Sequence, residues 1–216
     1  MAAHHSGSVV THRLTLRVVS RAIINTVFVL GCGQVMASPE GGAVVGGSGN
    51  INQSGLNTTI NQTSQNMAID WQTFNVNVDE RVQYIQPNSS SISLNRILSN
   101  TGSTIAGRID ANGQVILVNP HGVFFTPTSQ INVGGIIASG LDISSADFMN
   151  GDYIFNEVLG SEGAVINSGI ISASLGGNVA LLGRSVENNG LISANLGTVN
   201  LAAGKQAVLT FDTNGF

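Results

Sequence analysis

Few side chains in this sequence could do chemistry. After residue 37, His121 is the only histidine and no cysteine remains, so the clustered ligands of a zinc site are missing. A hydrolytic triad would need His121 together with a serine and a carboxylate, and Asp110 lies near it in the sequence. The glycine-flanked serine of a nucleophile elbow is absent. We therefore expect no metal and no cofactor, and we expect His121 to serve a turn.

Acidic side chains are the other candidates, because paired carboxylates cleave polysaccharides. Here they are scattered across predicted loops and do not recur at one spacing; those considered are Asp70, Asp79, Glu80, Asp142, Asp147 and Asp152. A carbohydrate-active enzyme is therefore the alternative to a protein without catalytic activity. A cluster of these carboxylates on one face would favour it. The glycine-rich stretch 41–49 lacks the Lys-Ser/Thr of a phosphate-binding loop.

The composition is that of a folded protein rich in turns. Charged residues make up 9% of the 216 positions, roughly a third of the usual share, while 42% are hydrophobic and 27 are glycine. Disordered chains combine low hydrophobicity with high net charge, which this chain does not. Nucleic-acid binding needs a basic surface, and eight Lys and Arg in the whole chain do not supply one. These proportions favour a β-protein with a polar, largely uncharged surface.

The first 37 residues have the organisation of an export signal. Arg13, Arg17 and Arg21 precede a short apolar stretch over 22–32, and Val35-Met36-Ala37 resembles a cleavage site. We predict a signal peptide over 1–37 and a mature chain over 38–216, with five basic against twelve acidic residues. Two alternatives are a buried N-terminal helix and a lipoprotein box ending at Cys32. Cleavage after Ala37 removes the only cysteine and with it any disulfide.

Two turns punctuate the stretch 105–123. The apolar runs Ile105–Ile109 and Val115–Val118 read as strands, and Asn112-Gly113 between them predicts a tight turn with positive φ. A rigid turn follows at Asn119, Pro120, His121 and Gly122, because proline fixes φ and glycine accepts unusual φ values. We expect the Asn119 side chain to bond neighbouring backbone groups in an Asx turn.

A repeat of about 21 residues governs the C-terminal half. Gly169, Ile171 and Ala173 recur 21 residues later as Gly190, Ile192 and Ala194, and Val179 and Leu181 recur 20 residues later as Val199 and Leu201. Glycine and asparagine interrupt the repeat too often for helices. Propeller blades need about twice this period, and a sandwich would not repeat so closely. We predict an all-β fold, a right-handed parallel β-helix with one repeat per coil.

This architecture places specific side chains. Ile171, Val179 and Leu181 should form buried columns over Ile192, Val199 and Leu201, because alternate side chains of a strand point inward. The irregular strands after Ile51 should cap the N-terminal end, preceded by a loose lead-in over 38–49. The aromatic residues Phe148, Tyr153 and Phe155 fall in a non-repeating insertion, predicted as a strand pair or loop outside the helix.

The motifs together resemble a known family. They are 71–75 (Trp-Gln-Thr-Phe-Asn), 94–97 (Leu-Asn-Arg-Ile, with Asn95 and Arg96), 105–107, 111–125 (with Asn112 and Gly113) and 131–139. In order and spacing they resemble the N-terminal secretion domain of two-partner-secretion exoproteins, of the filamentous-haemagglutinin and high-molecular-weight-adhesin type. The resemblance covers roughly residues 48–210. Two features depart from it: His121 stands where asparagine is usual, and a second Asn-Pro motif is replaced by Gln86-Pro87-Asn88-Ser89.

The resemblance implies a function. Residues 38–216 would be the secretion (haemagglutination-activity) domain of a large exoprotein. The periplasmic domains of an outer-membrane β-barrel transporter would recognise it, with Asn119, Pro120, His121 and Gly122 as the recognition or turn motif. The chain would pass through the periplasm to the surface of a Gram-negative cell, where a host-cell surface is a further partner. The alternatives are a β-helical carbohydrate-active enzyme and a short surface adhesin in its own right.

Overall fold

The computed structural model describes Met1 and residues 38–210. The predicted export signal, including Cys32 and the lipoprotein alternative, lies outside the described residues apart from Met1. Among the described residues, no helix is both long and apolar enough to cross a membrane.

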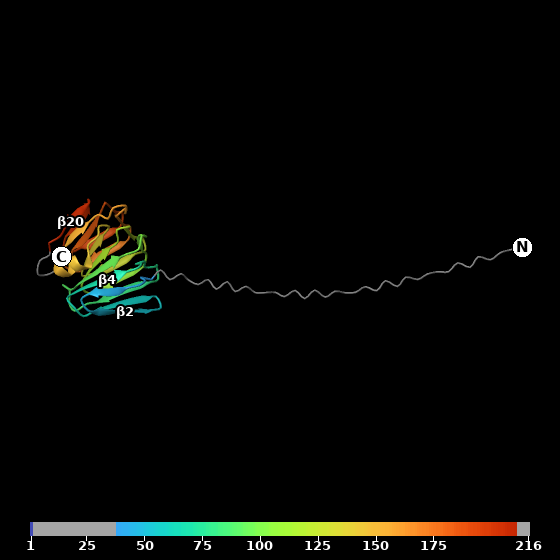
Figure 1. The fold of residues 1–216 in the computed structure, drawn as a ribbon, viewed down its shortest axis with the longest axis horizontal. Coiled ribbons are helices and arrows are strands. Elements are labelled where there is room, and N and C mark those ends of the chain that lie inside the picture. Colours follow the sequence, from blue (N-terminus) through green and yellow to red (C-terminus); the bar gives the residue numbers. More distant parts are fainter. Residues whose placement is uncertain (2–37, 211–216) are drawn as a thin grey trace. The chain divides into compact units, whose positions relative to one another are not determined.

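Three β-sheets form the sides of a solenoid, which Figure 1 shows running from β2 at one end to β20 at the other. We call the first sheet the covered sheet, because an insertion described below packs on its outer face. Its strand order is β1-β4-β6-β9-β12-β16-β19. Its strands are Ala43–Gly46, Asn66–Trp71, Ile92–Ile97, Gln114–Val118, Gly135–Ser139, Val179–Gly183 and Val199–Ala203. The open sheet has the order β18-β15-β11-β8-β5-β3-β2. Its strands, from β2 to β18, are Gly49–Ser54, Asn57–Gln62, Arg81–Ile85, Arg108–Ala111, Gln130–Val133, Ile170–Ala173 and Leu191–Ala194.

The short sheet contains β7 (Ser103–Ile105), β10 (Val123–Phe125), β14 (Ala164–Asn167) and β17 (Ser185–Asn188). The chain visits the open, covered and short sheets in turn, for example through β8, β9 and β10, and then stacks the next coil in parallel register. The predicted parallel β-helix is therefore confirmed. The run Ile105–Ile109 is two strands rather than one, because a corner between sheets falls at 106–107.

Antiparallel strands close the N-terminal end. β1 pairs antiparallel with β4, and β2 pairs antiparallel with β3, as expected of capping strands. The prediction of a loose lead-in over 38–49 is wrong, because β1 and the start of β2 lie within it. Alternating polar and apolar residues are too few here to show a strand in the sequence, and pairing with β4 supplies the hydrogen bonds that order it.

The predicted columns align, but the last coil is less covered than expected. Ile171 pairs in register with Ile192, Val179 with Val199, and Leu181 with Leu201. The earlier member of each pair is fully buried, whereas Val199 is 43% and Leu201 47% exposed. Full burial was thus wrongly predicted for Val199 and Leu201, and Ile192 is only half-buried. An inward side chain needs a coil on both sides, and β19 is the terminal strand of its sheet.

Closely stacked glycines form one corner of the solenoid. A Cβ on Gly134 would lie 2.5 Å from the Gly113 carbonyl oxygen, and Gly177 and Gly197 crowd the preceding coil in the same way. The prediction of a positive-φ turn at Asn112-Gly113 is wrong, because the φ of Gly113 is not positive. β8 and β9 belong to different sheets, so the segment is a corner and needs glycine for space, where a hairpin would need it for φ.

One insertion leaves the solenoid between β12 and β14. We call residues 140–163 the clasp; it contains helix α1 (Ser145–Asn150) and β13 (Ile154–Asn156), which pairs antiparallel with β20 (Gln206–Val208). Only one strand of the observed pair, β13, belongs to the insertion, so the expected strand pair is found in part, and α1 was not predicted. The helix begins where the Ser144 hydroxyl accepts a hydrogen bond from the Asp147 amide and ends at Gly151 with φ 85°. Its six residues are too few for a periodic signal.

The clasp covers the outer face of the covered sheet with a second core. Leu141, Ile143, Phe148 and Phe155 of the clasp are at most 2% exposed. They pack in one cluster with outward side chains of the sheet, among them Leu94, Ile116, Val118, Ile137 and Leu182. Burying large apolar side chains is the main source of folding free energy, so the clasp holds several coils together at once.

Candidate functional site

The turn at 119–122 is built around the side chain of Asn119, which is fully buried. Its Oδ1 accepts a hydrogen bond from the His121 amide at 2.9 Å, as an Asx turn requires. Its Nδ2 donates to the Thr101 carbonyl and to the Ser103 hydroxyl, both at 3.0 Å. All the polar atoms of this amide are therefore used inside the protein.

Backbone bonds tie the same turn to the coils on both sides. The Asn119 amide donates to the Ser139 carbonyl at 2.9 Å, and the Ser103 amide donates to the Gly122 carbonyl at 2.9 Å. Gly122 has φ +111°, and a Cβ there would lie 2.7 Å from the Phe124 ring and 3.1 Å from a backbone oxygen. The turn thus joins three successive coils, and its last position requires glycine.

The turn motif presents little surface. Asn119, Pro120 and Gly122 are buried, and only His121 is half-buried. The His121 side chain makes no hydrogen bond among the residues that the structure describes. A partner that binds the folded domain could therefore contact the His121 side chain but not the side chains of Asn119 or Pro120.

Asn95 and Arg96, on β6, connect the core to the clasp. Asn95 is fully buried, accepts a hydrogen bond from Trp71 Nε1 at 3.1 Å and donates to the Ile116 carbonyl at 3.3 Å. Arg96 forms a bidentate pair with Asp142, with nitrogen–oxygen distances of 2.8 and 2.7 Å. The hydrogen bond to Asp142 raises the pKa of Arg96. One motif thus satisfies a buried tryptophan and fixes the start of the clasp.

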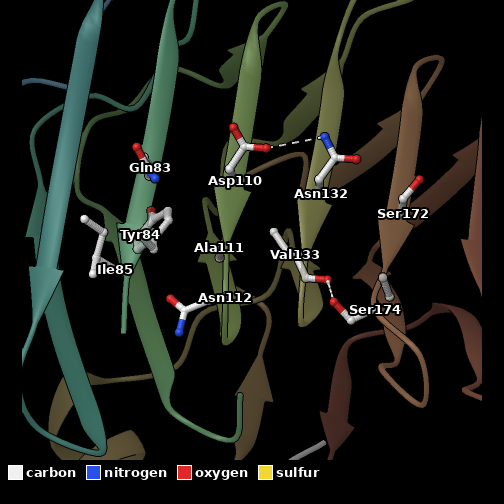
Figure 2. Close-up of a pocket in the computed structure, with 11 residues that line it drawn as sticks. Gln83, Tyr84, Ile85, Asp110, Ala111, Asn112, Asn132, Val133, Ser172 and Ser174 are labelled. Carbon is white, nitrogen blue, oxygen red and sulfur yellow. Dashed lines mark hydrogen bonds between the residues drawn. The ribbon is translucent and has the colours of Figure 1, made fainter. Parts of the chain in front are cut away.

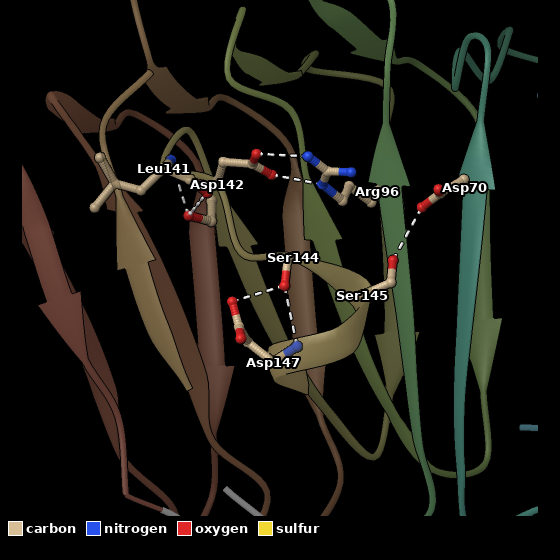
Figure 3. A network of polar contacts seen from close by, with 8 residues as sticks. Asp70, Arg96, Leu141, Asp142, Ser144, Ser145 and Asp147 are labelled. Atoms are coloured by element: carbon tan, nitrogen blue, oxygen red, sulfur yellow. Dashed lines mark hydrogen bonds and ion pairs between the residues drawn. The ribbon is translucent and has the colours of Figure 1, made fainter. Parts of the chain in front are cut away.

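Figure 3 shows this network at the clasp. The Ser145 hydroxyl donates to Asp70 on β4 at 3.0 Å, beside the Arg96–Asp142 pair. At the other end of the clasp, Glu157 lies 3.5 Å from Arg184 and 3.3 Å from Lys205. Early and late coils are therefore both joined to this insertion.

Asn112 and Gly113 hold the corner through Gln86. Asn112 accepts from the Gln86 amide and donates to the Gln86 carbonyl, each at 2.8 Å, and the Gly113 amide donates to Gln86 Oε1 at 2.9 Å. Gln86 is 6% exposed and also donates to the Ser91 carbonyl at 3.0 Å. Sequence reasoning gave Gln86 only a turn. The sequence signal for this larger role was a glutamine in a segment otherwise made of small turn residues.

These motif residues do not converge on one surface. Asn112 and Gly113 precede β9, whereas Asn119 follows it, and Asn95 pairs in register with Leu117 in the middle of it. They lie at several places around β9, and each links neighbouring segments of the solenoid. Their common property is to fix the stacking of neighbouring coils.

A groove on the outer face of the open sheet is a different kind of site, and the sequence did not reveal it. It has a volume of about 630 Å³ and is lined by Gln83, Asp110, Asn112, Asn132, Ser172 and Ser174, together with Tyr84, Ile85, Ala111, Val133 and Ala173. Figure 2 shows Gln83, Asp110, Asn132 and Ser172 lying side by side on four adjacent strands. The available signal was a polar residue at the same position of successive predicted strands.

Asp110 lines this groove and is paired with two arginines beside it. Its Oδ2 accepts hydrogen bonds from the Nε atoms of Arg81 at 2.6 Å and Arg108 at 2.7 Å. Partial burial raises the pKa of Asp110, but the hydrogen bonds from Arg108 and Arg81 outweigh it, so the pKa lies below its usual value. Glycoside hydrolysis uses two carboxyl groups. Among the described residues lining the groove, Asp110 is the only carboxylate.

The comparisons with known proteins match this architecture. The model of the family described as "TPS secretion domain" matches residues 35–215. The chain belongs to this family. The crystal structure of the HMW1 secretion domain from Haemophilus influenzae is similar over 80% of this chain and 46% of that chain, with a TM-score of 0.77 and 34% identity. The resemblance to two-partner-secretion domains is thereby confirmed.

Two heme/hemopexin-binding proteins of Haemophilus influenzae are relatives of this TPS secretion domain. One, from strain Rd, is 34% identical over 203 residues, which cover 90% of this chain and 22% of the relative. The other is 36% identical over 97 residues, which cover 45% of this chain and 10% of the relative. The chain thus spans about a fifth of the length of the first relative. This is the size relation of a secretion domain to a large exoprotein.

Proposed function

We propose that this TPS secretion domain directs its exoprotein through a dedicated outer-membrane β-barrel transporter. The signal peptide over 1–37 would take the chain to the periplasm. The periplasmic domains of the transporter would then bind the secretion domain, and the chain would reach the cell surface of a Gram-negative bacterium. Membership of the secretion-domain family over residues 35–215 is the observation that carries the proposal.

The buried turn supports a particular order of events. Asn119 and Pro120 are inaccessible in the folded domain, so any direct reading of these side chains must precede folding. A solenoid suits such a route, because each coil needs only its neighbour and folding can propagate as coils emerge. On this view the side chains of the turn are accessible to the transporter before the domain folds, and the same turn then locks three coils in register as folding proceeds during export.

The Asn119→Ala variant tests the proposal. It leaves the buried Ser103 hydroxyl and two partly buried backbone groups without their amide partner, and we expect a loss of about 1–3 kcal/mol in unfolding free energy. Less protein should be secreted and more retained in the periplasm of cells that carry the cognate transporter. The measurement is the ratio of secreted to periplasmic protein.

Two matched variants sharpen this test. His121→Asn keeps the backbone of the turn and should be secreted like the wild type, since the imidazole makes no hydrogen bond among the described residues. A Pro120→Ala/Gly122→Val double variant should fail, because Gly122 has positive φ and no room for a side chain. Normal secretion of the Asn119 variant or of the double variant would remove this turn from the export mechanism.

A further inference from the structure

The outer face of the open sheet carries an unbroken row of hydrogen-bonding side chains. Strand register aligns one residue from each of the seven strands: Asn52, Thr59, Gln83, Asp110, Asn132, Ser172 and Ser193. Neighbouring strands lie about 4.8 Å apart, so the row repeats a polar group at that interval. Six of its seven members are uncharged amides or hydroxyls, which both donate and accept hydrogen bonds.

The groove lies along the middle of this row. Its volume of about 630 Å³ falls within the range of small-molecule sites, roughly 300–1,000 Å³. Ala111 and Ala173 also line it, although their side chains pack against the inner core. The side chains of Gln83 and Ser172 are half-buried and that of Asn132 is exposed. A ligand here would meet side chains only, because the backbone groups of a central strand are used in the sheet.

Two guanidinium groups border the groove and share one carboxylate. Arg81 and Arg108 are in register with one another and both bond Asp110 Oδ2 through Nε, so their terminal nitrogens lie outside these bonds. Their side chains are 40% and 50% exposed. The local charge is therefore positive on a chain of formal net charge −4. Guanidinium groups bind carboxylates strongly and with defined geometry.

We propose that this groove binds an acidic oligosaccharide, with Gln83, Asn132 and Ser172 bonding its hydroxyl groups and Arg81 and Arg108 its carboxylate. A repeating row of donors and acceptors matches a ligand that repeats hydroxyl groups along its length. An extended peptide would instead pair with backbone at a sheet edge, which the groove does not offer. The proposal does not depend on the export function, since it concerns the folded domain.

The test is titration of the purified chain with tetragalacturonate, followed by calorimetry. We expect saturable binding, with a neutral galactose tetramer binding at least about tenfold more weakly for lack of the charge-assisted bonds. Arg108→Gln should weaken tetragalacturonate binding about tenfold. Lys205→Gln removes one positive charge outside the groove and should change the dissociation constant by less than about twofold, as an exposed charge acts weakly at a distance.

A second variant separates the hydroxyl contacts from the charge. Asn132→Leu should weaken the acidic and the neutral tetramer by the same factor, because it removes a bond that both can make, and thermal unfolding of each variant checks that the coils remain folded. No saturation up to about 10 mM, which corresponds to negligible affinity, overturns the proposal. Equal losses from Arg108→Gln and Lys205→Gln, or equal binding of tetraglutamate, overturn it too, in favour of net charge or of an acidic peptide.

Discussion

The covered sheet and the open sheet have equal strand numbers and the same parallel stacking, yet their outer faces differ. On the covered sheet, Leu94, Ile116 and Ile137 point outward into a second core closed by the clasp. On the open sheet the corresponding row is polar and faces solvent along a groove. Each coil contributes to both faces. Coil stacking alone therefore does not decide what a face does; the outward side chains and any insertion that covers them do.

The two faces also differ in how far their contacts reach. A solenoid is held by contacts between neighbouring coils, and its stability is close to a sum over them. The clasp breaks this rule, because Arg96 bonds Asp142 across 46 positions and Asp70 bonds Ser145 across 75. β13 further pairs with β20 after the last coil. The clasp should therefore make unfolding of the whole domain more cooperative than stacking alone would.

Of the substitutions considered, Phe148→Ala should lower the free energy of unfolding most. Phe148 is fully buried in the second core, and large-to-small changes of buried phenylalanine cost about 3–5 kcal/mol. Asn132→Ala is the matched change on the open sheet and should stay within about 0.5 kcal/mol. Urea unfolding measures both. Similar losses at the two positions would show that the clasp does not stabilise the solenoid.

Low pH should remove the stability that Asp110 contributes on the open sheet. Because the pKa of Asp110 is lowered in the folded protein, its pairing with Arg81 and Arg108 contributes in full above the unfolded pKa and is lost as pH falls through the folded pKa. The stability difference between wild type and Asp110→Asn should be constant above about pH 5 and shrink below about pH 4. Thermal unfolding across this range measures it. A difference that grows toward low pH contradicts the assignment.

Tyr84→Phe should change the free energy of unfolding least, and the change should be a gain where the other substitutions cause a loss. Tyr84, on the inward side of the open sheet, is 2% exposed, and its hydroxyl has no hydrogen-bond partner among the described residues. Burial raises its pKa far above the usual range, so the phenol stays neutral. Removing an unsatisfied hydroxyl should leave stability unchanged or raise it by about 1 kcal/mol. A clear loss in urea unfolding would reveal a bonded hydroxyl.

Much of the solenoid was determined by the sequence itself. The recurrence of Gly169, Ile171 and Val179 in the next repeat predicted which strands stack and in which register, and the pairs are found as predicted. The Asx turn at Asn119 was predictable for the same reason: its bond to the His121 amide spans two residues. Information of this kind lies in a periodic pattern or a local motif, where neighbouring side chains decide the conformation.

Other features of the fold and of the groove follow from contacts between segments that are distant in the sequence. Whether Gly113 makes a hairpin or a corner depends on the sheet that β9 joins, and whether Leu201 is buried depends on what lies above its coil. The packing of helix α1 and the Arg96–Asp142 pair depend on segments far apart in the chain, which carry no common period. The groove arises because Gln83, Asp110, Asn132 and Ser172, dispersed over 90 positions, become neighbours through strand register. A single sequence shows such residues separately, and the coil stacking brings them together.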